Sequence, residues 1–217
     1  MKMKIKSVFA FIIGATMLAS CSQNASTSAE TTAEPVDTTA IVINTIMSRH
    51  SVRKYKDTPV EREKLQEIVK CGVNAPNGMN AQPWIVRVVD SKEYIDGVTE
   101  VYKKANPEQV AKDPDFKNMF RNAPAFIAIA SPNDGSGQID CGLMGENMMI
   151  AAQAMGLGTC ALGGPVHFLL NNEEAKPYVE KLEIPSDYRL LYMIAVGYPD
   201  ETPDPKPRDM SKVKFID

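Results

Sequence analysis

The chain has 217 residues, of which 44% are hydrophobic and 24% charged, and its formal net charge is -3. These proportions are ordinary for a globular protein and exclude a chain that is disordered throughout. The balance of charge leaves no basic surplus, so we expect no nucleic-acid partner. Once an N-terminal segment is set aside, the remaining length suits one domain.

The N-terminus has the pattern of an export signal. Lys2, Lys4 and Lys6 precede an apolar stretch from Val8 to Leu18, which is too short to cross a bilayer as a helix. A positive start followed by a short apolar stretch is typical of a signal peptide. We therefore predict a signal peptide over residues 1–20.

The signal ends in Leu18-Ala19-Ser20-Cys21, which resembles a bacterial lipobox, where cleavage precedes a cysteine that is then acylated. The alternative is an ordinary secretory signal that leaves Cys21 as a free thiol. Several acyl chains hold a protein firmly on a membrane. We therefore expect a lipid anchor at Cys21 and a location in the bacterial cell envelope, outside the cytoplasm and facing the periplasm.

The segment after Cys21 differs from the rest in composition. Residues 21–40 are rich in Ser, Thr, Ala and Glu and have almost no large apolar residue. Such a segment cannot bury enough surface to order itself, which predicts a disordered tether. An apolar helical spacing begins at Ile41, so we place the folded domain at residues 41–217.

Two elements are predicted in the first part of the domain. A helix runs from about Val60 to Asn74 and ends before Pro76. Its inner face is expected to carry Leu65, Ile68, Val69 and Gly72. Residues 84–89 are rich in β-branched side chains and predict a mostly buried strand.

The rest of the domain alternates helices and strands. Residues 92–104 predict a helix, and the polar, proline-containing stretch that follows as far as residue 122 is a candidate lid. Apolar runs at 125–130 and 190–197 predict a central strand and a last strand. Residues 140–157 are apolar around the whole helix circumference, which predicts a helix buried in the core or at a subunit interface. The proline-rich tail must run extended over the surface.

Residues 156–161, Gly-Leu-Gly-Thr-Cys-Ala, match the letters of a dinucleotide-binding fingerprint. They follow a predicted helix and precede a predicted strand, whereas the fingerprint needs a strand, a turn and then a helix N-terminus for its pyrophosphate. We therefore interpret the segment as a helix C-cap and exclude a Rossmann site.

Two short basic clusters lie at opposite ends of the domain: Arg-His-Ser-Val-Arg at residues 49–53, and Lys-Pro-Arg at residues 206–208. Arginine offers a rigid planar fork and serine a short hydroxyl donor, and both suit a phosphate. In an extended segment Arg49, Ser51 and Arg53 share one side, which leaves Val52 and Tyr55 to pack. A solvated basic strip is the alternative.

Two further segments have groups suited to a planar ligand. Residues 75–84, Ala-Pro-Asn-Gly-Met-Asn-Ala-Gln-Pro-Trp, combine turn formers with amides that can hydrogen-bond the edge of a polar ring. In this turn we expect Gln82 to hold the backbone and Trp84 to enter the core. The paired glycines in Leu162-Gly163-Gly164-Pro165 let backbone amides approach a ligand closely.

Taken in this order, the motifs resemble the FMN-dependent nitroreductase family over residues 41–217. The resemblance implies an α+β fold with three α-β-α layers, in which helices flank a mixed central sheet. It implies an extended C-terminal tail that embraces a partner subunit. It also implies a homodimer with FMN sites at the interface.

The resemblance also assigns roles to residues. Those that would hold the phosphate and ribityl oxygens are Arg49, His50, Ser51, Arg53, Lys206 and Arg208. Those that would contact the flavin ring are Pro76, Asn77, Gly78 and Asn80. The loop whose backbone N–H groups would lie near the flavin N5 atom contains Leu162, Gly163 and Gly164. Some relatives carry Asn and Lys where this chain has Phe116 and Met119.

The activity implied is two-electron transfer from a reduced donor to a small electrophilic acceptor, such as a nitroaromatic or a quinone, by a ping-pong mechanism. The flavin would carry the chemistry, so no catalytic side chain is required. The donor would be NAD(P)H or a reductant of the cell envelope. The alternative is an envelope lipoprotein that binds a flavin or another small molecule without turnover.

Cysteine and histidine usage favours neither a disulfide framework nor a metal centre. Cys71, Cys141 and Cys160 are odd in number and lack Cys-x-x-Cys spacing, so we expect packed thiols. The two histidines have no ligand constellation around them, and we expect no metal.

Overall fold

The structure is a computed structural model that describes residues 37–217. The predicted signal peptide, Cys21 and most of the predicted tether lie outside the described residues. Helix α1 (Thr38–Ser48) begins slightly earlier than predicted, because the Asp37 carboxylate accepts hydrogen bonds from the backbone N–H groups of Thr39 and Ala40 at 3.0 and 3.1 Å.

The centre of the domain is a four-stranded sheet with strand order β1-β2-β4-β3. Its strands are β1 (Ile85–Val89), β2 (Ala125–Pro132), β3 (Gly158–Leu162) and β4 (Tyr188–Gly197). We predicted a mixed sheet. All three strand pairs are instead antiparallel, and the one parallel pairing among the described residues is the isolated bridge between Ser51 and Thr159. The central strand β2 is buried, whereas β1 is half-buried rather than mostly buried because it lies at an edge.

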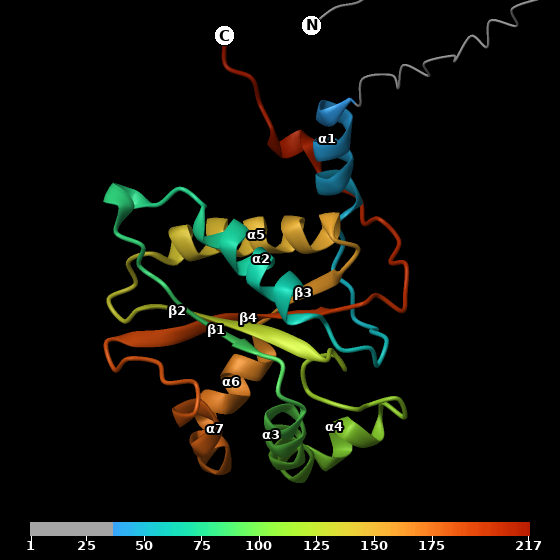
Figure 1. Cartoon of the computed structure of the whole chain (residues 1–217), viewed down its shortest axis with the longest axis vertical. Coiled ribbons are helices and arrows are strands. Elements are labelled where there is room, and N and C mark those ends of the chain that lie inside the picture. The colour runs from blue at the N-terminus through green and yellow to red at the C-terminus, as the bar shows by residue number, and fades with distance from the viewer. Residues whose placement is uncertain (1–36) are drawn as a thin grey trace, which may run out of the picture. The chain divides into compact units, whose positions relative to one another are not determined.

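Helices cover both faces of the sheet, which confirms the three-layer α-β-α prediction (Figure 1). One layer contains α2 (Arg62–Val73) and α5 (Gln138–Ala154). The other contains α3 (Lys92–Ala105), α4 (Pro107–Ala111), α6 (Gly164–Asn171) and α7 (Lys176–Glu180). Short 3-10 turns occur at η1 (Gly78–Asn80), η2 (Glu173–Ala175) and η3 (Met210–Lys212).

The sheet separates two hydrophobic clusters. Because successive strand residues point to opposite faces, Phe126 packs with the α3 and α6 side whereas Ile127 packs with α2 and α5. Phe126 stacks on Phe120 with ring centroids 4.2 Å apart. On the opposite side, a Cβ added at Gly145 would lie 1.8 Å from the Tyr192 hydroxyl oxygen, so glycine at this position lets α5 approach the sheet closely.

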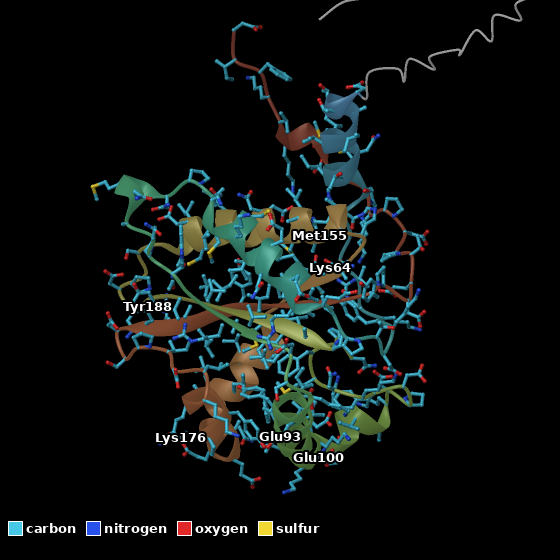
Figure 2. All side chains as sticks on the ribbon, viewed as in Figure 1. Lys64, Glu93, Glu100, Met155, Lys176 and Tyr188 are labelled. Carbon is cyan, nitrogen blue, oxygen red and sulfur yellow. The ribbon has the colours of Figure 1, made fainter. Side chains whose placement is uncertain are left out.

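Helix α1 and the C-terminal tail project from the α5 side of the domain (Figure 1). Met155, just beyond the end of α5, lies at the base of this projection (Figure 2). No residue of α1 is buried, and its apolar side chains Ile46 and Met47 are 47% and 72% exposed. Phe215 and Ile216 in the tail are also exposed. These two segments therefore form an apolar surface that the chain itself leaves uncovered.

Within residues 37–217, no helix combines the length and the apolar character that crossing a membrane would require.

Candidate functional site

The first basic cluster lies on an extended segment at the β3 edge of the sheet. The backbone N–H of Val52 donates to Thr159 O at 2.9 Å, and the N–H of Lys56 donates to Tyr198 O at 2.9 Å. Val52 and Tyr55 are buried, as predicted. The segment from Arg49 to Tyr55 is thus fixed along strand β3 and along the chain that leaves β4.

Tyr55 holds this segment in place. Its hydroxyl donates to Val52 O at 2.7 Å, and burial raises the pKa of the phenol well above its ordinary value. The Tyr55 hydroxyl therefore stays protonated throughout the physiological range, and its role is structural.

Arg49 is oriented by helix α5. Its Nε lies 3.1 Å from Glu146 Oε1, and its side chain is 21% exposed. This contact engages one side of the planar guanidinium, while the terminal nitrogens Nη1 and Nη2 form no hydrogen bond among the described residues. An arginine held in this way presents the rest of its fork to an anion.

A cavity of about 400 Å³ joins two of the predicted groups. Arg53 from the first cluster lines it together with the loop residues Leu162, Gly163 and Gly164. Apart from the adjoining backbone and the neighbouring residues in the chain, no heavy atom lies within 4 Å of the position that a Cβ would take at Gly163 or Gly164. The volume lies in the range of small-molecule sites, and the two glycines leave their backbone open to a ligand.

Much of the remaining lining of the cavity comes from the end of helix α3 and from the segment predicted as a lid. Tyr102 and Phe116 stack with ring centroids 5.8 Å apart and planes 16° from parallel, and both line the cavity. Met119 lines it as well, so the two positions at which this chain departs from some relatives, Phe116 and Met119, both belong to the cavity lining. The lid also contributes polar residues that the sequence did not indicate, namely Gln109, Asp113, Asn118, Arg121 and Asn122.

The loop that carries Arg121 has a strained backbone. Arg121 and Asn122 have φ angles of 61° and 65°, in the left-handed region. Asn122 Oδ1 accepts from the N–H groups of Lys117 and Asn118 at 2.8 and 3.0 Å, and Asn122 Nδ2 donates to Asp115 O at 2.8 Å. Such conformations cost about 1–3 kcal/mol each and persist where surrounding bonds over-determine them, often at functional sites.

The amide-rich turn is also strained, but Asn77 holds it rather than Gln82 as we expected. Asn77 Oδ1 accepts from the backbone N–H of Gln82 at 2.8 Å. Met79, Asn80 and Gln82 have φ angles of 54°, 53° and 48°. The Gln82 side chain forms no hydrogen bond among the described residues, because the shorter Asn77 side chain spans the turn. Trp84 is half-buried against the α2 and α5 core.

One chain does not bring this turn to the first basic cluster. Pro83 packs beside Gly137, the residue that precedes α5. Arg49 contacts α5 at Glu146 and Ser48 contacts it at Gln153. These contacts lie about 14 and 24 Å along the helix from Gly137. The turn that contains Pro76, Asn77, Gly78 and Asn80 therefore lies near the N-terminal end of α5, whereas Arg49 contacts the middle of the helix and Ser48 its last turn.

The second basic cluster lies on the exposed tail. Arg208 Nη1 donates to Lys206 O at 3.0 Å. Neither side chain forms an ion pair or a hydrogen bond with the first cluster among the described residues, so the shared phosphate site of the two clusters stays a prediction.

The thiols and acidic groups add no metal centre to the part of the chain that the structure describes. Cys71, Cys141 and Cys160 are free, and burial, aided by the charge of Asp140, raises the pKa of Cys141 to about 11. Among residues 37–217, no three His, Cys, Asp or Glu side chains are grouped to hold a metal ion.

Comparison with known proteins decides the family. The profile of the nitroreductase family matches residues 46–198. The chain belongs to the nitroreductase family. Within it, the chain is 30% identical over 171 residues to an NADPH-flavin oxidoreductase of Vibrio harveyi, covering 76% of this chain and 69% of the relative. It is 29% identical over 166 residues to a relative from Archaeoglobus fulgidus named as a putative NADH dehydrogenase/NAD(P)H nitroreductase, with coverage of 73% and 86%.

Solved structures of the family share the fold. A nitroreductase with bound FMN from Desulfitobacterium hafniense has a TM-score of 0.69 at 23% identity, covering 81% of this chain and 98% of that one, and at this identity it shows the fold alone. An FMN-dependent nitroreductase from Clostridium difficile has a TM-score of 0.65 at 26% identity, with coverage of 81% and 98%.

Proposed function

We propose that this chain is an FMN-dependent oxidoreductase that passes two electrons from a reduced donor to a small electrophilic acceptor, such as a nitroaromatic or a quinone, by a ping-pong mechanism. The observation that carries the proposal is the cavity in which Arg53 meets the open backbone of Gly163 and Gly164. The relatives named as flavin oxidoreductases and nitroreductases support it.

The residues present fit FMN. The guanidinium of Arg49, fixed by Glu146, has free terminal nitrogens for a phosphate, and no side chain blocks the backbone at Gly163 and Gly164. Arg49, His50, Ser51 and Arg53 would hold the phosphate and ribityl oxygens together with Lys206 and Arg208. The amides of the Leu162 loop would hydrogen-bond the ring. When bound, FMN supplies the two-electron chemistry, and the protein binds it and shapes the space beside it.

We also propose that a second copy of the chain completes each site, giving a homodimer. Two observations support this. The apolar side chains of α1 and the tail are exposed, as is Ile139 on the outer side of α5. The turn from Pro76 to Asn80 lies near the N-terminal end of α5, about 14 Å along the helix from the residue that Arg49 contacts, so we take a partner's turn to meet a ring bound at this chain's Gly163 loop.

The test is spectroscopic. Purified protein is titrated with FMN, reduced anaerobically with NADPH, and then mixed with a quinone or a nitroaromatic. We expect near-stoichiometric flavin uptake, bleaching on reduction and recovery of the oxidised spectrum with the acceptor. A protein that takes up no FMN would contradict the proposal. Bound flavin that no acceptor reoxidises would instead support the binding lipoprotein without turnover.

We propose, from the sequence at Cys21, that the enzyme is lipid-anchored in the cell envelope. In cells fed a palmitate analogue, we expect the wild-type chain to incorporate the label and Cys21→Ser to lose it. Cys71→Ser is the matched control and should keep the label. An unlabelled wild-type protein in the cytoplasmic fraction would contradict the anchor.

The anchor would also decide the electron donor. NADH and NADPH are cytoplasmic pools, so an exported enzyme would take its electrons from a quinol, a small reduced metabolite or a partner redox protein, even where NAD(P)H reduces the flavin in vitro.

A further inference from the structure

The charges around the cavity are unbalanced. Arg53 and Arg121 both line it, and neither forms an ion pair within residues 37–217. Asp113 is the one carboxylate in the lining, and its Oδ1 accepts the N–H of Asp115 at 3.1 Å. Glu201, which lies nearby, accepts from the backbone N–H of Arg53 rather than from its guanidinium. Arg53 is already assigned to FMN in the proposed function, so Arg121 is the cation of the cavity lining that still lacks a counter-charge.

Arg121 is held at this wall by its strained loop. Its left-handed backbone is fixed by Asn122, whose side chain bonds the backbone of Asp115, Lys117 and Asn118, and Asn118 in turn accepts from the N–H of Phe120 at 2.9 Å. Arg121 itself forms no hydrogen bond among the described residues. The exposed Arg121 side chain belongs to the cavity lining, so its guanidinium is free to bind an anionic ligand there.

The same wall suits a planar ring. Tyr102 and Phe116 stack beside the cavity, and Met119 adds a further apolar surface. Aromatic faces of this kind favour an aromatic ligand. A ring against the stacked pair and an anionic group at Arg121 together define one class of compound.

We propose that Arg121 binds an anionic substituent of the acceptor, so that the cavity selects aromatic acceptors that carry a carboxylate. A guanidinium matches a carboxylate with two parallel hydrogen bonds, which a neutral amide cannot reproduce. This inference rests on the proposed function and names its substrate class. In the reaction, a nitro group takes two electrons and two protons from the reduced flavin and leaves as a nitroso group and water, while the carboxylate is unchanged.

The test compares 4-nitrobenzoate with 4-nitrobenzamide, which differ in charge and little in shape. Binding of each to the oxidised FMN-loaded protein is measured by calorimetry, and the rate of flavin reoxidation is measured after anaerobic reduction with dithionite. The two compounds differ in how easily they are reduced, so absolute rates are not compared. The informative quantities are the ratio of the affinity for 4-nitrobenzoate to that for 4-nitrobenzamide, and the same ratio of reoxidation rates, each compared between variants.

The variants are Arg121→Gly, Arg121→Lys and the control Lys112→Gln. Glycine tolerates the left-handed backbone at this position, so Arg121→Gly is expected to fold. We expect the affinity ratio to fall about tenfold in Arg121→Gly and to be largely kept in Arg121→Lys. Lys112→Gln removes a positive charge from the lid outside the cavity lining and should leave the ratio unchanged.

Two results would overturn the proposal. One is an equal benzoate-to-amide ratio in wild type and Arg121→Gly. The other is a large loss of FMN affinity in Arg121→Gly with the ratio unchanged, which would place Arg121 on the flavin rather than on the acceptor. If the protein prefers 4-nitrobenzoate in binding but neither compound reoxidises the flavin, the proposed anionic ligand is supported and the proposed redox function is contradicted. The two failures are therefore distinguishable.

Discussion

Replacement of Ile46 by aspartate is expected to give a monomer that has lost most of its FMN. Ile46 lies on α1, whose apolar side chains are exposed in one chain and would be covered in the proposed dimer. An unpaired charge placed in an apolar interface costs several kcal/mol, which weakens association by about a hundredfold or more. Sedimentation velocity together with the flavin-to-protein ratio measures both effects.

Leu170→Asp is the matched control, because Leu170 is an exposed apolar residue on α6, in the layer on the other side of the sheet. We expect this variant to remain dimeric and yellow. An Ile46→Asp protein that stays dimeric with a full complement of FMN would show that α1 does not form the interface.

Arg49→Ala is expected to weaken FMN binding about ten- to a hundredfold, the value of a charge-assisted hydrogen bond to a dianion. The substitution also leaves the Glu146 carboxylate without its partner beside the expected phosphate. Fluorescence titration of flavin-free protein at low salt measures the effect. Riboflavin lacks the phosphate, so its affinity should change little.

Three further variants sharpen this test. Glu146→Gln introduced into Arg49→Ala should recover part of the lost affinity, because it removes the carboxylate that would repel the phosphate. Arg208→Ala should weaken FMN binding as well if the tail cluster reaches the same phosphate. Lys54→Ala removes an exposed cation from the same segment and is the control. Unchanged FMN affinity in both arginine variants would refute the phosphate assignment.

The sequence predicted elements well where the signal is local. The apolar spacing of Leu65, Ile68 and Gly72 identified the buried face of α2, and the run of apolar residues after Ala125 identified the central strand. The direction of strand pairing was not predictable, because hydrogen bonds between β2 and β4 join segments far apart in the chain. The parallel bridge from Ser51 to Thr159 is similarly non-local.

The candidate site was also predictable only where its residues belong to local sequence motifs. Arg53, Gly163 and Gly164 belong to recognisable motifs, and the structure brings them to one cavity. Arg121 belongs to no motif, since its position depends on the backbone angle that the Asn122 side chain imposes. Asn77 rather than Gln82 holds the turn because its side-chain oxygen lies within hydrogen-bonding distance of the Gln82 N–H, and the amino-acid sequence alone does not show that distance.

The length of α5 has a genetic consequence. This helix keeps the Asn77 turn and the Arg49 segment of one chain apart. In the proposed dimer, each pocket therefore takes its Arg49 segment from one chain and its Asn77 turn from the other. Two inactive alleles, one damaged at Arg49 and the other in the turn, would then rescue each other when expressed together. In their mixed dimer both defects fall in the same pocket, and the second pocket is assembled entirely from intact parts.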